Sequence, residues 1–185
     1  NVTKRVKNLK LENFEFKNYS TIFWYVYGKN GHPIRTTVSK IGAKLLSRMM
    51  NLSDAQEGIL TIIFKISEDE NKELIDLKDL RAMINYVGEN KKEYTLKYGN
   101  INTQSLGSIQ RNLLTLEEED GEYFFGKPDF NITDFIKFDQ FSNKANINIL
   151  HAEDLFQKPT LYATFILWLL TTLYDTMPEV GDLDK

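Results

Sequence analysis

The chain has 185 residues, of which 42% are hydrophobic and 26% charged, a composition typical of a folded globular protein. Its formal net charge of −3 gives no indication of nucleic acid or an anionic membrane as a partner of the whole surface. Because the chain has no cysteine, it can form no disulfide, no thiolate metal site and no cysteine nucleophile. We therefore expect one domain, with at most an appendage, of a cytoplasmic protein.

The first 38 residues predict a lead-in followed by a hairpin. Residues 1–17 indicate a short helix or an irregular segment. Residues 21–27 read TIFWYVY, and these β-branched and aromatic side chains predict a strand. Residues 28–33 contain turn-forming glycines and a proline, so we expect residues 34–38 to return as the second arm of a β-hairpin.

Residues 39–120 predict a block of helices. Ser39 is expected to open the first helix, whose apolar residues recur at helical spacing. Ser53 and Gln56 have the spacing of a capping box, which predicts a second helix. The β-branched run at residues 59–66 would also fit a strand, but the cap and the length of the segment favour a helix.

The second half of this block continues the helical pattern. Asp76 is expected to cap a helix that Gly88 ends, and residues 90–98 predict a weaker helix. Residues 103–119 predict a strong helix that ends in the acidic run 117–120. Acidic side chains oppose the dipole at a helix C-terminus, so we expect this end either to fray or to meet a basic partner.

Residues 121–185 begin with an aromatic turn and a short helix or turn at 131–138. Residues 147–150 predict a buried strand, and residues 159–177 predict a long helix that Pro178 ends. The helix is apolar on nearly all sides, but its unbroken apolar run is about half the roughly 20 residues of a membrane span. We therefore expect a core helix of a soluble protein, with one stripe formed by Leu161, Phe165, Trp168, Leu169 and Leu173.

Residues 121–128 come within one residue of the phosphate-binding pattern GxxxxGK[ST]. That loop needs backbone N–H groups in a tight nest, a hydroxyl for Mg²⁺, a strand before it and a helix after it. Here aromatic side chains fill the loop, Pro128 replaces the hydroxyl residue, and a predicted helix precedes the segment. A turn with aromatic packing is the better interpretation.

No other pattern supplies complete catalytic machinery. His32 and His151 are the only histidines, and they favour structural or surface roles over a metal site. The carboxylates at residues 68–70 and 117–120 are adjacent in sequence and indicate solvated charge runs. The sequence therefore assigns no catalytic residue, no cofactor-binding residue and no metal ligand to this chain.

Five long strings, in order along nearly the whole chain, carry a resemblance to a known family. They are FWYVYGKNGHPIRTTVSKIG (23–42), NLSDAQEGILTIIFKI (51–66), LIDLKDLRAMINYVGEN (74–90), IQRNLLTLEEEDGEYFFG (109–126) and INILHAEDLFQKPTLYATFILWLLTTLYDTMPEVGDLDK (147–185). With these strings the chain resembles bacterial HerA-like ATPases, the HerA/FtsK-type helicases. The resemblance implies a RecA-like P-loop ATPase that uses ATP and Mg²⁺, assembles as a ring of six subunits, and acts on DNA as a translocase or helicase.

The resemblance also implies a position within that ATPase. The Walker A loop of the family lies before a segment like residue 1, and the Walker B strand follows a segment like PEVGDLDK. We therefore expect an α+β, predominantly helical fragment of a RecA-like α/β core. Its expected divisions are a core hairpin (1–38), a helical insertion (39–120), and an aromatic turn, core strand and long helix (121–185).

Arginines are the candidate functional residues that remain. Ring ATPases commonly complete a site with an arginine from the neighbouring subunit, and Arg35, Arg81 and Arg111 are the candidates here. Contact with DNA phosphates is a second possible role. The alternative for Arg81 and Arg111 is a structural role, with the charge paired to a nearby carboxylate, such as Asp76 or Asp79 for Arg81. For the whole chain, the alternative function is a protein-interaction module without DNA or nucleotide binding.

Overall fold

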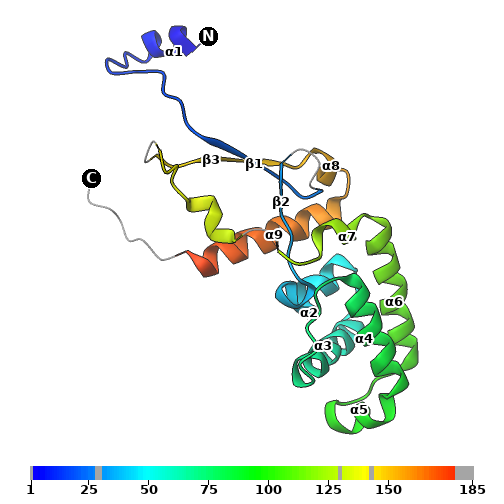
Figure 1. Cartoon of the computed structure of the whole chain (residues 1–185). Helices are drawn as coiled ribbons and strands as arrows, with labels where there is room; N and C mark the ends of the chain where they lie inside the picture. Colours follow the sequence, from blue (N-terminus) through cyan, green and yellow to red (C-terminus); the bar gives the residue numbers. More distant parts are fainter. Residues whose placement is uncertain (1, 28–30, 129–130, 142–143, 178–185) are drawn as a thin grey trace.

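The computed structural model describes residues 2–27, 31–128, 131–141 and 144–177 (Figure 1). Within these residues it is an α+β structure in which helices predominate and short strands form one sheet, as the sequence predicts. The elements in chain order are α1 (Val2–Asn8), β1 (Thr21–Tyr25), β2 (His32–Pro33), α2 (Val38–Met49), α3 (Asp54–Asp69), α4 (Leu77–Glu89), α5 (Lys91–Tyr98), α6 (Thr103–Glu118), α7 (Gly121–Phe124), the 3₁₀ helix η1 (Ile132–Ile136), β3 (Ile147–His151), α8 (Glu153–Phe156) and α9 (Pro159–Thr176).

The sheet has the strand order β2–β1–β3, and β1 pairs with both neighbours in parallel. The predicted β-hairpin is therefore wrong, and the predicted turn at residues 28–30 lies outside the described residues. β1 pairs along its whole length with β3, from Thr21 opposite Ile147 to Tyr25 opposite His151. A local sequence pattern cannot reveal this distant partner, which is why the adjacent segment was predicted to pair in its place.

The two faces of the sheet are covered differently. Register partners in neighbouring parallel strands point to the same side, so Phe23 and Ile149 share one face while Trp24 and Leu150 share the other. Trp24 packs against Phe135 of η1 with ring centroids 4.6 Å apart, and Leu150 packs against the core. Phe23 and Ile149 are 50% and 41% exposed. The prediction that β3 is a buried strand is therefore right about the strand and wrong about its burial.

Helix α9 starts at Pro159, as predicted, and runs beneath the sheet in the view of Figure 1. The predicted stripe faces inward: Leu161, Phe165, Trp168 and Leu169 are buried, and Leu173 is partly buried. The opposite side is uncovered, since Leu170 and Tyr174 are 59% and 85% exposed. Burial on all sides was therefore a wrong expectation. None of the helices in the described ranges is long and apolar enough to cross a membrane. Pro178, expected to end α9, lies outside the described residues.

Helices α2 to α6 form the block predicted for residues 39–120, with α3 packed against α2, α4 and α6 (Figure 1). The backbone N–H of Ser53 donates to Oε1 of Gln56 over 3.0 Å, which confirms the capping box. Residues 59–66 are helical, as the cap favours. Asp76 caps α4 through the N–H groups of Lys78 and Asp79, although the helix continues past Gly88 to Glu89.

The start of α2 differs in detail from the prediction. Thr37 is the N-cap, because its side chain accepts the N–H of Lys40 over 3.2 Å. The hydroxyl of Ser39 accepts the N–H of Leu74 over 2.9 Å instead, which ties α2 to the segment before α4. Gly42 then interrupts the helical conformation with φ 78° and ψ 161°, a left-handed φ that glycine adopts without steric cost.

An aromatic cluster joins the helical block to α9. Phe124 of α7 packs against Phe165 and Trp168 of α9, with ring centroids 5.5 and 5.3 Å apart and nearly perpendicular planes. Phe165 and Trp168 are themselves 5.9 Å apart. Edge-to-face packing of this kind adds to the gain from burial alone. The prediction that Phe165 and Trp168 are core residues is confirmed.

Candidate functional site

A groove of about 890 Å³ lies where the helical block meets the segments that lead to the sheet. It is lined by the first residues of α4, the last residues of α6, Glu122 of α7 and the residues that follow α7. Arg35 and Arg81, two of the three arginines singled out from the sequence, lie in this groove together with Glu117 and Glu122. The groove is therefore the place where the fold brings the sequence-derived candidates together.

Arg81 forms an ion pair across the groove with Glu117 of α6, with 2.5 Å between Nη2 and Oε2. The two side chains are 38% and 24% exposed, so solvent screens the pair only in part. The predicted partners, Asp76 and Asp79, are wrong because both carboxylates accept backbone N–H groups at the start of α4. The general expectation, a charge paired to a nearby carboxylate, is confirmed.

The acidic end of α6 meets basic partners within the chain. Besides the pair between Arg81 and Glu117, Nζ of Lys158 lies 2.7 Å from the backbone oxygen of Glu119 and 2.5 Å from Oδ2 of Asp120. Positive groups at a helix C-terminus interact favourably with its dipole and with its free carbonyl groups. Of the two expectations for this end, a basic partner is therefore confirmed.

Arg35 lies at the boundary between this groove and a second pocket. Its Nε donates a hydrogen bond to the backbone oxygen of Tyr123 over 3.1 Å, which fixes the guanidinium beside α7. No carboxylate of the described residues forms an ion pair with Arg35, in contrast to Arg81. Arg35 is thus positioned by one bond and keeps both Nη nitrogens for other partners.

Arg111 lies apart from the other two arginines. It is exposed on α6, where its Nη2 donates to the hydroxyl of Ser108 over 2.9 Å. It does not line the groove that holds Arg35 and Arg81. The fold therefore brings together two of the three candidates and leaves Arg111 on the outer surface. The expected pairing of Arg111 with a carboxylate is not observed among the described residues.

The segment that approaches the P-loop pattern forms the short helix α7 and a following turn. Phe124 and Phe125 are buried, which confirms the aromatic packing. The backbone N–H of Gly126 donates to the carbonyl of Thr36 over 3.0 Å, so this group is already used within the fold. The local geometry therefore agrees with the rejection of a phosphate loop at residues 121–128.

The histidines lie at opposite edges of the sheet. His32 begins β2 and packs near Trp24, with ring centroids 5.7 Å apart. His151 ends β3 and lies 3.5 Å from a carboxylate oxygen of Glu153. Among the described residues, no group of three or more histidine, aspartate or glutamate side chains could hold a metal ion.

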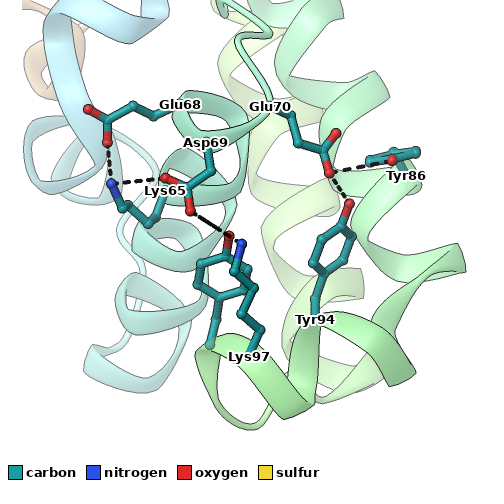
Figure 2. A network of polar contacts seen from close by, with 8 residues as sticks. Lys65, Glu68, Asp69, Glu70, Tyr86, Tyr94 and Lys97 are labelled. Carbon is teal, nitrogen blue, oxygen red and sulfur yellow. Dashed lines mark hydrogen bonds and ion pairs between the residues drawn. The ribbon is translucent and has the colours of Figure 1, made fainter.

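A polar network at the far end of the helical block was missed from the sequence (Figure 2). Glu70 accepts hydrogen bonds from the hydroxyls of Tyr94 and Tyr86, and Asp69 accepts one from Tyr98 over 2.6 Å. The interpretation of residues 68–70 as a solvated charge run therefore holds for Glu68 and Asp69, which are exposed, but is wrong for the half-buried Glu70. Tyr94 and Tyr98 are four residues apart on one helix face, a signal that could have indicated neighbouring acceptors on one facing segment.

The network changes the acid–base behaviour of its members. The ammonium of Lys72, followed by the hydroxyl of Tyr94, holds the pKa of Glu70 below its ordinary value. The hydrogen bond from Tyr98, followed by that from Lys65, lowers the pKa of Asp69. Because these bonds join the end of α3 to α4 and α5, we interpret the network as a structural clamp rather than a catalytic site.

The chain matches the model of a known protein family over its whole length. The model of the helicase HerA-like C-terminal family matches residues 1–185. The chain therefore belongs to the HerA-like helicase family. No curated protein and no solved structure matched the chain in the same comparisons.

Proposed function

We propose that this chain is a non-catalytic segment of a HerA-like, ring-forming ATPase that acts on DNA as a translocase or helicase. The observation that carries the proposal is the family match over the whole chain. ATP and Mg²⁺ would then be bound by the Walker A and Walker B motifs of the full-length protein, outside residues 1–185. The groove would contribute an arginine to the active site of a neighbouring subunit.

The architecture of the sheet supports the first part of this proposal. Parallel sheets occur almost only in α/β proteins, where both faces are covered. Here Phe23, Ile147 and Ile149 leave one apolar face exposed in the described residues. Such a face is expected where further strands and helices of an ATPase core would pack. The division into a core hairpin, a helical insertion and a core strand with its helix stays a prediction, with the hairpin corrected to a parallel pair.

The three arginines differ in how well their surroundings suit a residue that acts in a neighbouring subunit. Arg35 is oriented by its bond to Tyr123 and has no carboxylate partner among the described residues, so it is the best candidate for a residue that acts in a neighbouring subunit. Arg81 forms an ion pair with Glu117, and this pair would have to break before Arg81 could reach a neighbouring subunit. Arg111 is exposed and does not line the groove, which suits a DNA or protein contact better than catalysis.

The second candidate function is a protein-interaction module. One observation favours it: Leu96 is 91% exposed on α5, the helix at the end of the helical block in Figure 1. An exposed apolar side chain at the end of a helical block is suited to contact a partner. This alternative requires neither DNA nor nucleotide binding by the chain.

The arginines provide the experiment that separates these proposals. Each of Arg35, Arg81 and Arg111 is changed to alanine in the full-length protein, and ATP turnover, DNA affinity and ring assembly are compared. We expect Arg35→Ala to lose roughly 10³-fold or more in turnover while the ring still forms, as for a finger that acts in trans. Arg111→Ala is the matched control for turnover alone, because it removes one positive charge outside the groove. Wild-type turnover and DNA affinity in all three variants would favour the interaction module.

A further inference from the structure

A second pocket, of about 570 Å³, shares Arg35 with the groove. It lies between the start of α2, the segment before η1 and the last turns of α9. Its polar lining consists of Arg35, Thr36, Lys40, Asn131, Thr172 and Thr176. Segments that are distant in sequence thus bring several hydrogen-bond donors to one small volume.

The charge of this pocket is one-sided. Arg35 and Lys40 are both cationic, and no carboxylate of the described residues lines the pocket. The neighbouring groove is different, because its basic side chains are accompanied by Glu117, Glu118 and Glu122. A pocket with two positive charges and no described negative one attracts an anion.

Both cations are available to a ligand. Arg35 uses Nε for the carbonyl of Tyr123, which orients the guanidinium and leaves both Nη nitrogens free. Lys40 is exposed and forms no ion pair with the described carboxylates. A fixed guanidinium presents two parallel N–H groups to an oxyanion, and a lysine supplies a flexible point charge.

Thr36 supplies an independent observation. Its side chain is 1% exposed, lines the same pocket, and has a hydroxyl without a hydrogen-bond partner among the described residues. A buried hydroxyl without a partner is costly. The backbone on either side is held in place, because the N–H of Thr36 donates to Phe124 and its carbonyl accepts from Gly126. An oxyanion in the pocket would give this hydroxyl the acceptor that it lacks.

We propose that this pocket binds a phosphate group, with Arg35 and Lys40 as charge partners and the hydroxyl of Thr36 as a donor. The phosphate belongs either to the DNA backbone or to a free nucleotide. Phosphate oxygens accept hydrogen bonds from arginine, lysine, threonine and asparagine side chains, which are the polar residues present here. The site is one of contact and not of hydrolysis. The pocket shares Arg35 with the trans-acting role proposed above, so its test rests on Lys40 and Thr36, which have no part in that role.

The test uses the intact protein, with inorganic phosphate as the probe and calorimetry as the readout. Lys40→Gln removes one charge, and we expect phosphate affinity to fall about tenfold. Thr36→Val keeps the shape and removes the hydroxyl, so we expect affinity to fall several-fold while the melting temperature is maintained or rises. Lys44→Gln is the matched control, because Lys44 is also exposed on α2 but does not line the pocket.

Any other phosphate site of the protein is common to all variants, so the differences between variants report on this pocket. Equal phosphate affinity in the wild type, Lys40→Gln and Thr36→Val would overturn the proposal. The source of the phosphate follows from two further titrations, with a short single-stranded oligonucleotide and with AMP. A DNA contact predicts that Lys40→Gln weakens oligonucleotide binding and lowers its salt dependence, whereas a nucleotide site predicts weaker AMP binding only.

Failure of the phosphate-pocket proposal can be distinguished from failure of the proposed ATPase function. A protein that hydrolyses no ATP but loses phosphate affinity in Lys40→Gln would uphold the pocket and refute the ATPase. An active ATPase whose phosphate affinity is the same in all variants would uphold the proposed function and refute the phosphate pocket.

Discussion

Phe124 is the residue whose removal tests most directly how the helical block is attached to α9. The ring is fully buried and packs edge to face on Phe165 and Trp168. Truncation of a buried phenylalanine costs about 3–5 kcal/mol, and the loss of two aromatic contacts places Phe124→Ala toward the upper end of that range. We therefore expect the urea midpoint to fall strongly without a change in the slope of the transition.

The matched control is Phe141→Ala, because Phe141 is 99% exposed and its truncation should change the free energy of unfolding by less than about 0.5 kcal/mol. A double-mutant cycle between Phe124→Leu and Phe165→Leu should show a coupling of about 0.5–1.5 kcal/mol. If Phe124→Ala were no more destabilising than Phe141→Ala, α7 would not be attached to α9 as described.

Three further predictions concern polar contacts. Because the folded protein holds the pKa of Glu70 below its ordinary 4.5, its carboxylate stabilises the fold above that pH, and this stability is lost as the pH falls through the lowered pKa. Glu70→Gln should therefore flatten the acid limb of unfolding below about pH 5, and an unchanged acid limb would contradict this. A cycle between Arg81→Met and Glu117→Gln should give a coupling of about 0.5–1 kcal/mol that falls with added salt, since the pair is partly exposed; a coupling near zero at low salt would show that the pair does not form. Asp76→Ala should cost about 1 kcal/mol in thermal unfolding, because it removes the acceptor for two N–H groups of α4; an unchanged melting temperature would exclude that cap.

Local signals predicted the helices well. The capping box at Ser53 correctly indicated a helix where the β-branched residues also allowed a strand, and Asp76 correctly indicated the start of α4. Both are interactions between residues that are close in sequence, so the sequence alone contains them. The predicted stripe of α9 was also correct, because helical spacing determines which side chains share a face.

Contacts between distant segments could not be predicted in this way. The pairing of β1 with β3 replaced the expected hairpin, and it depends on where the helical block returns the chain. The exposed faces of β3 and α9 were expected to be buried, because their side chains are hydrophobic. A hydrophobic sequence indicates that burial is favourable, but it does not show whether the described residues cover those side chains.

The candidate site was also predictable from the sequence only in part. The sequence named Arg35, Arg81 and Arg111 but could not tell that only the first two share a groove. The partner of Arg81 was expected nearby in sequence, at Asp76 or Asp79, and is Glu117 on α6. Lys40 and Thr36 were not singled out at all, because their relation to Arg35 appears only when α9 and the segment before η1 close the pocket.

The central claim, that this HerA-like chain works within an ATP-driven DNA motor, is tested most directly by nucleotide-dependent DNA binding of the full-length protein. DNA affinity is measured by fluorescence anisotropy without nucleotide, with ADP, and with a non-hydrolysable ATP analogue and Mg²⁺. The account predicts that affinity differs between these states by about fivefold or more, the usual scale of coupling between two sites. The same DNA affinity in every nucleotide state, or no DNA binding in any of them, would contradict it.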